Sequence, residues 1–205
     1  MKIAIIGSGN VGGALAIGWA QSGHDVIIGA RNKESEKVKK VTSQNAGIKV
    51  KSIKEATKES EVILIAGNPN AVEEISKRLG DVKEKIIIDA MNSVSSKPNG
   101  FNNTFEALKS LTNSGNIVKC FNSTGFENMA NPKYYNTSAD MFMAGNSLKG
   151  KQVASKLAKD LGFAECFDFG GDDKVWLLEQ LALVWINLAI FQKFGRNIAI
   201  KIIKR

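Results

Sequence analysis

The sequence of 205 residues predicts an α/β protein with a doubly wound, mostly parallel sheet and a C-terminal helical extension. Three observations support this fold class. Short runs rich in Ile and Val alternate with helical patterns, a glycine cluster follows the first run, and a long apolar helix pattern comes last. Continuous apolar strands that alternate with helices are typical of a parallel sheet covered on both faces.

The strand candidates are short apolar runs separated by segments of helical length. They are KIAII (2–6), DVIIG (25–29), EVILIAG (61–67), KIIIDA (85–90), NIVKCF (116–121), and two shorter runs at 141–145 and 165–169. The periodicity of apolar residues predicts helices between them. These helices cover 10–22, 32–45, 70–79, 103–113 and 148–161.

Residues 174–192 form one long helix candidate that is apolar on most of its circumference. Such a helix is buried on more than one side, either by its own chain or by a second subunit. Gly195 ends the pattern, and a basic amphipathic turn follows to Arg205. We therefore expect a domain over 1–168 with added strands and a C-terminal helical segment over 169–205.

The charge and the cysteines favour an ordinary globular protein. The formal net charge is +8, but the lysines are scattered and interleave with Glu. This distribution favours a solvated surface over a nucleic-acid interface. Cys120 and Cys166 lie in apolar runs without a CxxC pair or a Cys/His cluster, so we expect reduced thiols and neither a disulfide nor a metal site.

The apolar stretches are too short to predict a leader or a membrane anchor. The start IAIIG is only five residues long and runs straight into glycines, and the stretch 181–191 is about half a membrane span and contains Asn187. We expect a soluble, cytoplasmic protein that has a small-molecule substrate and no nucleic-acid or membrane partner.

The glycine cluster IIGSGNVGGALA (5–16) carries the clearest chemical signal. Gly7, Gly9 and Gly12 form a GxGxxG pattern between a predicted strand and a predicted helix. In this pattern the first glycine allows a tight turn, the second lets a pyrophosphate approach the backbone, and the third lets the helix pack against the strand. The helix N-terminus also offers free N–H groups to phosphates. The motif predicts a dinucleotide-binding domain of the Rossmann type.

The end of the second strand indicates which dinucleotide binds. NAD-binding domains place an acidic residue about 20 positions after the motif, whereas an Arg there accommodates a 2′-phosphate. Arg31 lies 19 positions after Gly12, and Asn32 and Lys33 follow it. Since a guanidinium pairs bidentately with a phosphate, we expect NADP. The alternative is that Arg31 is a solvated residue at a helix start.

Over nearly its whole length the chain resembles the F420-dependent NADP oxidoreductases, whose fold also forms the cytosolic domain of the STEAP metalloreductases. The resemblance implies a Rossmann domain with a small C-terminal helical segment, a homodimer, and NADP along the carboxyl edge of the sheet. It rests on IGSGNVGGALA (6–16), IGARN (28–32), NPNAV (68–72), CFNSTGFENMANP (120–132), MFMAG (141–145) and the C-terminal blocks LLEQLALVWINLA and GRNIAIKIIKR within 177–205.

The resemblance also implies cofactor-binding residues. Ser8, Gly9, Asn10 and Val11 would hold the pyrophosphate, and Ala30 with Arg31 the 2′-phosphate. Where the family often has a basic residue four positions after that Arg, this chain has Ser35, and Lys33 or Lys37 is the substitute. The residues expected near the ribose, the nicotinamide and the reacting ring are Asn68, Pro69, Val72, Asn92, Asn122 and Thr124.

Few residues of the chain are candidates for a catalytic acid or base, and we assign no catalytic residue. His24 is the only histidine, and its turn lies at the amino edge of the predicted sheet, so we interpret it as a structural connector. No Tyr-x-x-x-Lys pair is present, and Asp172–Asp173 is interpreted as a capping turn. Hydride transfer between a nicotinamide and a second planar ring needs mainly stacking, orientation and exclusion of water.

The leading hypothesis is an NADP(H)-dependent oxidoreductase that passes hydride to or from a flavin-like or deazaflavin carrier such as F420. Trp176, Trp185 and Phe191 would wall the second ring or, alternatively, belong to the core or a dimer interface. A second hypothesis is a reductase of a small carbonyl or imine. A third is a non-catalytic NADP sensor that signals through its dimer interface. A nucleic-acid-binding module is the last.

Overall fold

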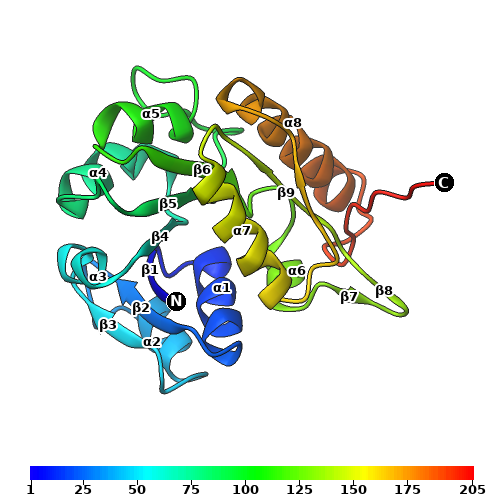
Figure 1. Ribbon diagram of the computed structural model, residues 1–205. Coiled ribbons are helices and arrows are strands. Elements are labelled where there is room, and N and C mark those ends of the chain that lie inside the picture. The colour runs from blue at the N-terminus through cyan, green and yellow to red at the C-terminus, as the bar shows by residue number, and fades with distance from the viewer.

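The computed structural model describes all 205 residues and confirms the predicted fold class (Figure 1). Ten strands are present: β1 Lys2–Ile6, β2 Asp25–Gly29, β3 Lys49–Lys51, β4 Val62–Ile65, β5 Ile86–Asp89, β6 Asn116–Cys120, β7 Lys133–Tyr134, β8 Thr137–Ser138, β9 Met141–Ala144 and β10 Cys166–Asp168. The α-helices are α1 Asn10–Gln21, α2 Glu36–Thr42, α3 Ile53–Glu59, α4 Val72–Leu79, α5 Thr104–Leu111, α6 Phe126–Ala130, α7 Leu148–Asp160 and α8 Val175–Ile186. Two 3₁₀ turns, Pro69–Ala71 and Asp172–Lys174, precede α4 and α8.

One sheet holds eight of the strands, in the order β10-β9-β6-β5-β4-β1-β2-β3. All neighbouring strands in it are parallel except β6 and β9, which are antiparallel. The chain passes from β1 to β2 and β3 on one side, then returns to build β4, β5 and β6 on the other. This reversal beside β1 is the place where doubly wound folds bind ligands.

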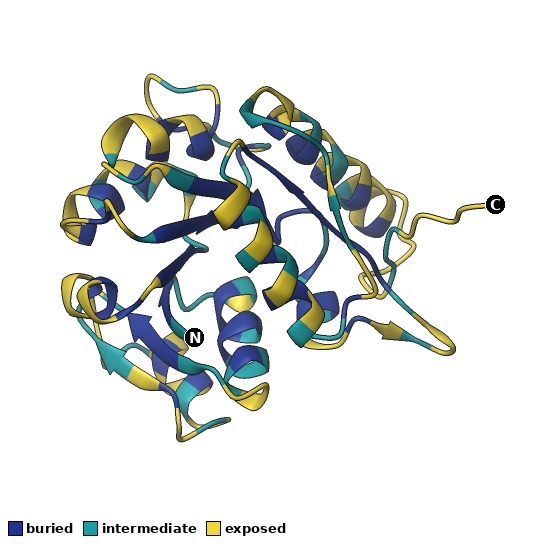
Figure 2. Cartoon of the chain, viewed as in Figure 1, coloured by how far each residue is buried: buried dark blue, intermediate teal, exposed yellow.

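Helices cover both faces of the sheet because the strand residues alternate between them. Ile3 and Ile5 of β1 belong to one hydrophobic cluster, which includes residues of α1, α2 and α7. Ala4 and Ile6 belong to the other, which includes residues of α3, α4, α5 and α8. Successive strand side chains point to opposite faces, and Figure 2 shows the central strands of the sheet as buried.

Two details of the N-terminal half differ from the sequence prediction. The helix expected over 32–45 is limited to α2, because the Asn32 side chain accepts the Glu34 N–H and Ser35 is extended at the helix N-cap. The short elements β3 and α3 were not predicted. In α3 a capping box joins Ser52 and Glu55 and starts the helix.

The C-terminal segment starts as predicted and ends differently. Helix α8 continues as a π-helical turn over Asn187–Phe191 and no helix follows, so only the first part of the segment expected over 169–205 is helical. The tail is instead held by distant side chains. The Trp185 indole donates to the Ile198 carbonyl at 2.8 Å, and the Asp140 carboxylate accepts the Ile202 N–H at 2.8 Å. The division at residue 168 stays a prediction.

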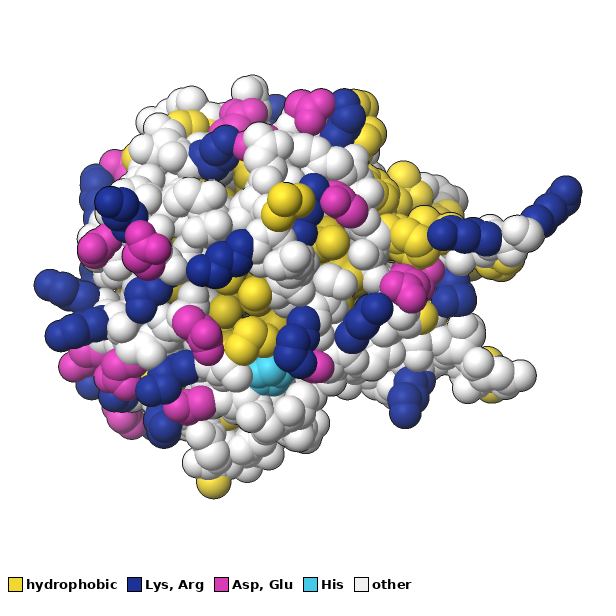
Figure 3. Space-filling model, in the orientation of Figure 1, with side chains coloured by type: hydrophobic (Ala, Val, Ile, Leu, Met, Phe, Trp, Pro, Cys, Tyr) yellow, Lys and Arg dark blue, Asp and Glu magenta, His cyan; other side chains and the backbone are white.

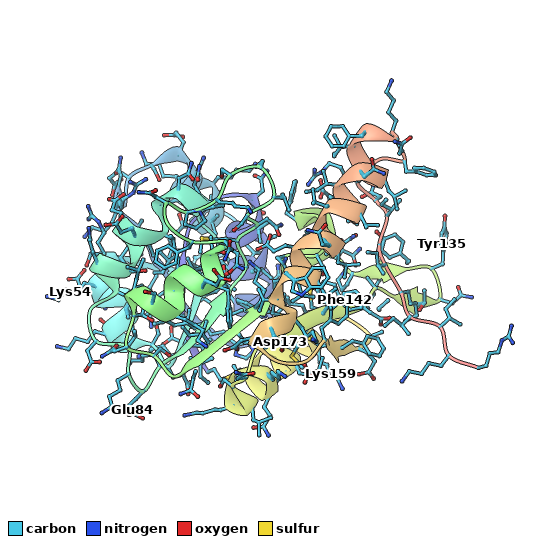
Figure 4. All side chains as sticks on the ribbon, turned by 90° about the horizontal axis from the view of Figure 1, so that it is seen from above. Lys54, Glu84, Tyr135, Phe142, Lys159 and Asp173 are labelled. Atoms are coloured by element: carbon cyan, nitrogen blue, oxygen red, sulfur yellow. The ribbon has the colours of Figure 1, made fainter.

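One side of α8 packs on the sheet and the other side is exposed. Val175, Leu178 and Ala182 are buried, and Figure 4 shows Phe142 of β9 beside the helix. Trp176 and Phe191 are 56% and 70% exposed, and apolar side chains gather over α8 in Figure 3. The chain covers only one face of this helix, so the second-subunit alternative stays open.

The helical stretch Asp172–Phe191 has 20 residues and a mean hydropathy of 1.5, enough by length and composition alone to cross a membrane. This is weak evidence, because the core helix of a soluble protein meets the same criterion. Here Val175, Leu178 and Trp185 face the chain's own core.

Candidate functional site

A cleft of 710 Å³ opens at the carboxyl ends of β1, β2 and β4. Ile6, Gly29 and Ile65 are aligned in the sheet register, so these strands end at one level. The cleft is bordered on one side by the glycine loop and the β2–α2 loop, and on the other by the start and outer face of α4. Of the residues that the sequence predicted to bind the cofactor, the cleft lining contains Gly7, Ser8, Gly9, Ala30, Arg31, Asn32 and Asn68.

The glycine loop fits a pyrophosphate. A Cβ on Gly12 would lie 1.8 Å from the Gly7 carbonyl oxygen, so only glycine lets α1 start this close to β1. A Cβ on Gly9 would meet nothing within 4 Å, so the backbone of this cleft residue faces open space. Gly9 is also the N-cap of α1, and no side chain caps that helix. The first N–H groups of α1 are therefore available to an anion.

The β2–α2 loop and α4 face each other across the cleft. Arg31 Nη1 donates to Glu74 Oε2 at 3.0 Å, and Glu74 Oε1 lies 3.0 Å from Arg78 Nη2. Lys37 and Ser35 also line this end. The Arg31 side chain is also 63% exposed, so the alternative of a solvated residue at a helix start stays open beside this ion pair.

The β4–α4 connection is rigid where it borders the cleft. The Asn68 side chain accepts the Asn70 N–H at 2.9 Å, and Pro69 begins the 3₁₀ turn that leads into α4. Val72 is 1% exposed and belongs to the hydrophobic core, so its side chain is not a cleft contact.

Two asparagines pair at the ends of β5 and β6, outside the lining of this cleft. Asn122 Nδ2 donates to Asn92 Oδ1 at 3.0 Å, and Asn92 Nδ2 donates to the Asn122 carbonyl at 2.9 Å. The buried Asn122 Oδ1 has no hydrogen-bond partner within the protein. Thr124 lies beyond this pair, and its hydroxyl accepts a hydrogen bond from Asn128 Nδ2.

Other predicted residues lie around this arrangement. Asn10 lines a neighbouring cavity of 280 Å³, which shares Ser8, Gly9 and Lys37 with the cleft. Val11 is half-buried against the core. Lys33 is exposed and does not line the cleft.

A buried ionic cluster ties α8 to the sheet near the asparagine pair. Lys119 Nζ of β6 lies 3.0 Å from Asp89 Oδ2 and 2.7 Å from Glu179 Oε1, and it also donates to the Met91 carbonyl. Burial alone would lower the pKa of the Lys119 ammonium, but the two carboxylates outweigh it and the pKa is raised. Glu179 Oε2 accepts the Ser93 N–H at 2.8 Å. The cluster therefore holds the β5 loop that carries Asn92.

The residues set aside as structural lie where that interpretation expects them, with one difference. His24 Nε2 lies 3.0 Å from Asp160, away from the cleft lining. Asp172 makes no helix-capping bond, since the N-cap of α8 is Lys174 and no side chain caps that helix. Its carboxylate instead accepts the Asn146 N–H at 2.7 Å and pairs with Lys109. The Asp172–Asp173 turn thus anchors a loop and does not cap α8.

Sequence reasoning missed Glu74, Arg78, Lys119 and Glu179. Glu74 and Arg78 are four residues apart on a predicted helix that follows the strand candidate 61–67, which is a weak signal for one helical face. Lys119 interrupts an apolar strand pattern, and Glu179 is the one charged residue between Lys174 and Lys193. Such isolated charges in apolar elements signal a buried pair.

Comparison with known proteins agrees with this geometry. Residues 2–93 match the model of a family described as NADP oxidoreductase, coenzyme F420-dependent. The chain is 28% identical to the F420-dependent NADP reductase of Methanothermobacter marburgensis over 228 aligned positions, which cover 98% of each chain. The chain is thus similar to the F420-dependent NADP oxidoreductases, over residues 2–93 in the family model and over nearly its full length in this relative. The expected resemblance is confirmed, and the family is one of NADP-dependent oxidoreductases.

Solved structures share the fold. A candidate F420-dependent NADP reductase from Arthrobacter sp. FB24 superposes with a TM-score of 0.86 at 23% identity, over the full length of both chains. The reductive aminase of Aspergillus terreus, in complex with NADPH and ethyl-5-oxohexanoate, gives a TM-score of 0.70 at 18% identity. That match covers 94% of this chain and 63% of the aminase. At these identities the likeness establishes the fold alone.

Proposed function

We propose that this protein is an NADP(H)-dependent oxidoreductase that transfers hydride between NADP(H) and a flavin-like or deazaflavin acceptor of the F420 type. The observation that carries the proposal is the joint placement of the GxGxxG loop and Arg31 in one cleft at the carboxyl ends of the strands. When bound, NADPH supplies a hydride, and the acceptor ring takes a further proton from solvent.

The chain's own residues bind and orient in this proposal. The α1 N-terminus and the loop of Gly7, Ser8 and Gly9 hold the pyrophosphate, and Arg31 holds the 2′-phosphate. Asn68, Asn92 and Asn122 border the nicotinamide end. The orphaned Oδ1 of Asn122 would accept a hydrogen bond from the carboxamide. No acid or base of the chain is assigned to the transfer.

The acceptor class follows from this lack of an assigned proton donor and from the name of the relative in Methanothermobacter marburgensis, which acts on F420. Reduction of a carbonyl or imine would call for a group that protonates the substrate, and the ionisable groups near the asparagine pair, such as Lys119 and Glu179, are buried and paired with one another. The carbonyl and imine reductase remains the second candidate, because the fold is shared with a reductive aminase in complex with NADPH.

The first test is equilibrium binding of NADPH and NADH to the wild type and to Arg31→Ala. A bidentate charged contact should be worth about 1.5–3 kcal/mol, roughly tenfold to more than a hundredfold in affinity. We expect NADPH to bind more tightly and Arg31→Ala to lose mainly that preference. Lys77→Ala is the control, since Lys77 pairs with Glu73 outside the cleft. Equal binding of NADPH and NADH would refute the 2′-phosphate assignment.

The second test is turnover with a panel of acceptors, followed as loss of NADPH absorbance. We expect turnover with a deazaflavin or flavin and little with quinones, ferric chelates, carbonyls or imines. Turnover with imines or carbonyls alone would favour the second candidate. Tight NADPH binding without turnover of any acceptor would favour the sensor.

We further propose that the protein is a cytoplasmic homodimer whose subunits meet on the exposed side of α8. Trp176, Val184 and Phe191 are 56%, 50% and 70% exposed there. Large contiguous apolar surface of this kind is usual at subunit interfaces. Light scattering of the wild type should give twice the chain mass, and Phe191→Asp should shift the protein toward the monomer. A monomeric wild type at micromolar concentration would refute this interface.

A further inference from the structure

The wall of the cleft opposite the glycine loop carries charged side chains that no part of the glycine motif requires. Helix α4 directs Glu74 and Arg78, four residues apart, into the lining of the cleft. Glu74 places one carboxylate oxygen 3.0 Å from Arg31 and the other 3.0 Å from Arg78. One carboxylate thus joins two guanidiniums that come from opposite walls.

This arrangement is specific to one face of α4. Glu73 and Lys77 form an i,i+4 pair of the same kind one residue earlier, but neither residue lines the cleft. Helix α4 therefore carries two ion pairs of the same spacing, one that lines the cleft and one that does not. Only the pair of Glu74 and Arg78 reaches the residue that the sequence assigns to the 2′-phosphate.

The charges of the cleft match a phosphate. Arg31, Lys37 and Arg78 are its cations and Glu74 is its one carboxylate, which leaves a surplus of two positive charges. A phosphomonoester carries about −1.5 to −2 charges at neutral pH. Arg78 and Lys37 therefore supply the positive charge that is missing at Ser35.

The ion pairs around Glu74 are suited to exchange. The side chains of Arg31, Glu74 and Arg78 are 63%, 42% and 51% exposed. Exposed pairs of this type contribute little free energy, so a ligand that offers better acceptors can take the guanidiniums from the carboxylate. A phosphate offers three oxygens and more charge than Glu74, whereas a ribose 2′-hydroxyl offers neither.

We propose that Glu74 and Arg78 together determine how strongly the protein prefers the 2′-phosphorylated cofactor. Glu74 competes with the 2′-phosphate for Arg31 and Arg78, and Arg78 is the second guanidinium of the phosphate site. The inference rests on the proposed function and adds to it a competing anion and a cation from α4.

The test measures the dissociation constants of NADPH, NADH and 2′,5′-ADP for the wild type, Glu74→Gln and Arg78→Ala. Glu74→Gln should bind NADPH and 2′,5′-ADP about three- to tenfold more tightly, since a repelling charge and a competitor are removed. Arg78→Ala should bind both about three- to tenfold more weakly. NADH should change less than twofold in either variant. The controls are Glu73→Gln and Lys77→Ala, which should leave all three constants within twofold of the wild type.

A salt series sharpens the result. Between 0.1 and 1 M KCl the Debye length falls from about 10 to about 3 Å. The gain of Glu74→Gln should shrink over this range if it comes from charge.

The outcomes separate this inference from the cofactor assignment. A wild-type preference for NADPH that either variant leaves within twofold overturns the role of α4, while the NADP assignment stands. Equal binding of NADPH and NADH by the wild type, or no binding of either, overturns both.

Discussion

Two ionic clusters in this protein have inverse composition and opposite surroundings. Beneath α8, one ammonium, that of Lys119, lies between the carboxylates of Asp89 and Glu179, and the three side chains are 0%, 0% and 9% exposed. In the cleft, the single carboxylate of Glu74 lies between two guanidiniums, all more than 40% exposed. Burial decides what each cluster can do.

The side chains of the buried cluster keep one another as partners, because solvent barely reaches them to take the place of a partner. Its carboxylate oxygens are all used, since Asp89 also accepts the Met91 N–H and the Thr104 hydroxyl, and Glu179 accepts the Ser93 N–H. Removing one partner leaves an uncompensated charge in low dielectric. The exposed cluster has water as an alternative partner, so we expect it to contribute little to stability, and we propose that it serves recognition.

The largest expected effect is that of Lys119→Met. The substitution keeps the volume but leaves two buried carboxylates without their cation, and we expect a loss of about 3–5 kcal/mol in the free energy of unfolding. Urea unfolding followed by circular dichroism measures it. Lys77→Met, which breaks the exposed pair with Glu73, is the control and should cost less than about 0.5 kcal/mol. Equal losses in the two variants would remove the contrast between the clusters.

The next effect is that of Glu179→Gln, which leaves Asp89 to pair with Lys119. The amide cannot accept from both Lys119 and the Ser93 N–H, so we expect a loss of about 1–3 kcal/mol. In the Lys119→Met background the same change should cost nothing or stabilise, because it removes one of two unpaired carboxylates. Additive losses in this double-mutant cycle would show that the two side chains do not interact.

Sequence patterns predicted the parts of the site that depend on local spacing. The GxGxxG loop and Arg31 lie in one cleft because both follow directly from strand ends, and parallel strands end at the same edge. The α4 wall could not be predicted in the same way. Glu73–Lys77 and Glu74–Arg78 have the same spacing, and only the rotation of α4 about its axis decides which pair meets the cleft.

The remaining misses have a common physical cause. The tail after Phe191 is held by side chains far away in the sequence, such as Asp140, so the pattern of residues in the tail does not predict its path. Lys119 and Glu179 are 60 residues apart, and their pairing is visible only once β6 and α8 are packed together. Such nonlocal contacts were not predicted, whereas the fold class and most of the strands follow from local signals.

The ion pairs of Asp160 lie between the two clusters in burial, and they test whether the contribution to stability grows with burial. Asp160 is 23% exposed and pairs with His24 and Lys156. Burial would raise the pKa of Asp160, but hydrogen bonds from Lys156 and His24 outweigh it, and the pKa is lowered from 3.8. A lowered carboxyl pKa contributes stability above the unfolded value, and that contribution is lost as the pH falls through the folded value.

We therefore expect Asp160→Asn to cost about 0.5–1.5 kcal/mol at pH 5. The difference from the wild type should shrink as the pH falls from 5 toward 3, because the wild-type carboxylate becomes protonated in the folded state as well. Urea unfolding of both proteins across this range measures the trend. A difference that stays constant down to pH 3 would mean that the charge of Asp160 contributes nothing.

The smallest expected effect is that of Glu74→Gln on stability. The substitution breaks two ion pairs, with Arg31 and Arg78, as many as Lys119→Met breaks beneath α8. Because these pairs are exposed, we expect the free energy of unfolding to change by no more than about 0.5 kcal/mol. Parallel urea titrations with and without 2′,5′-ADP check this. A loss above about 2 kcal/mol without ligand would make the Glu74 cluster a structural element like the buried one, and its guanidiniums would then not be free to exchange a carboxylate for a phosphate.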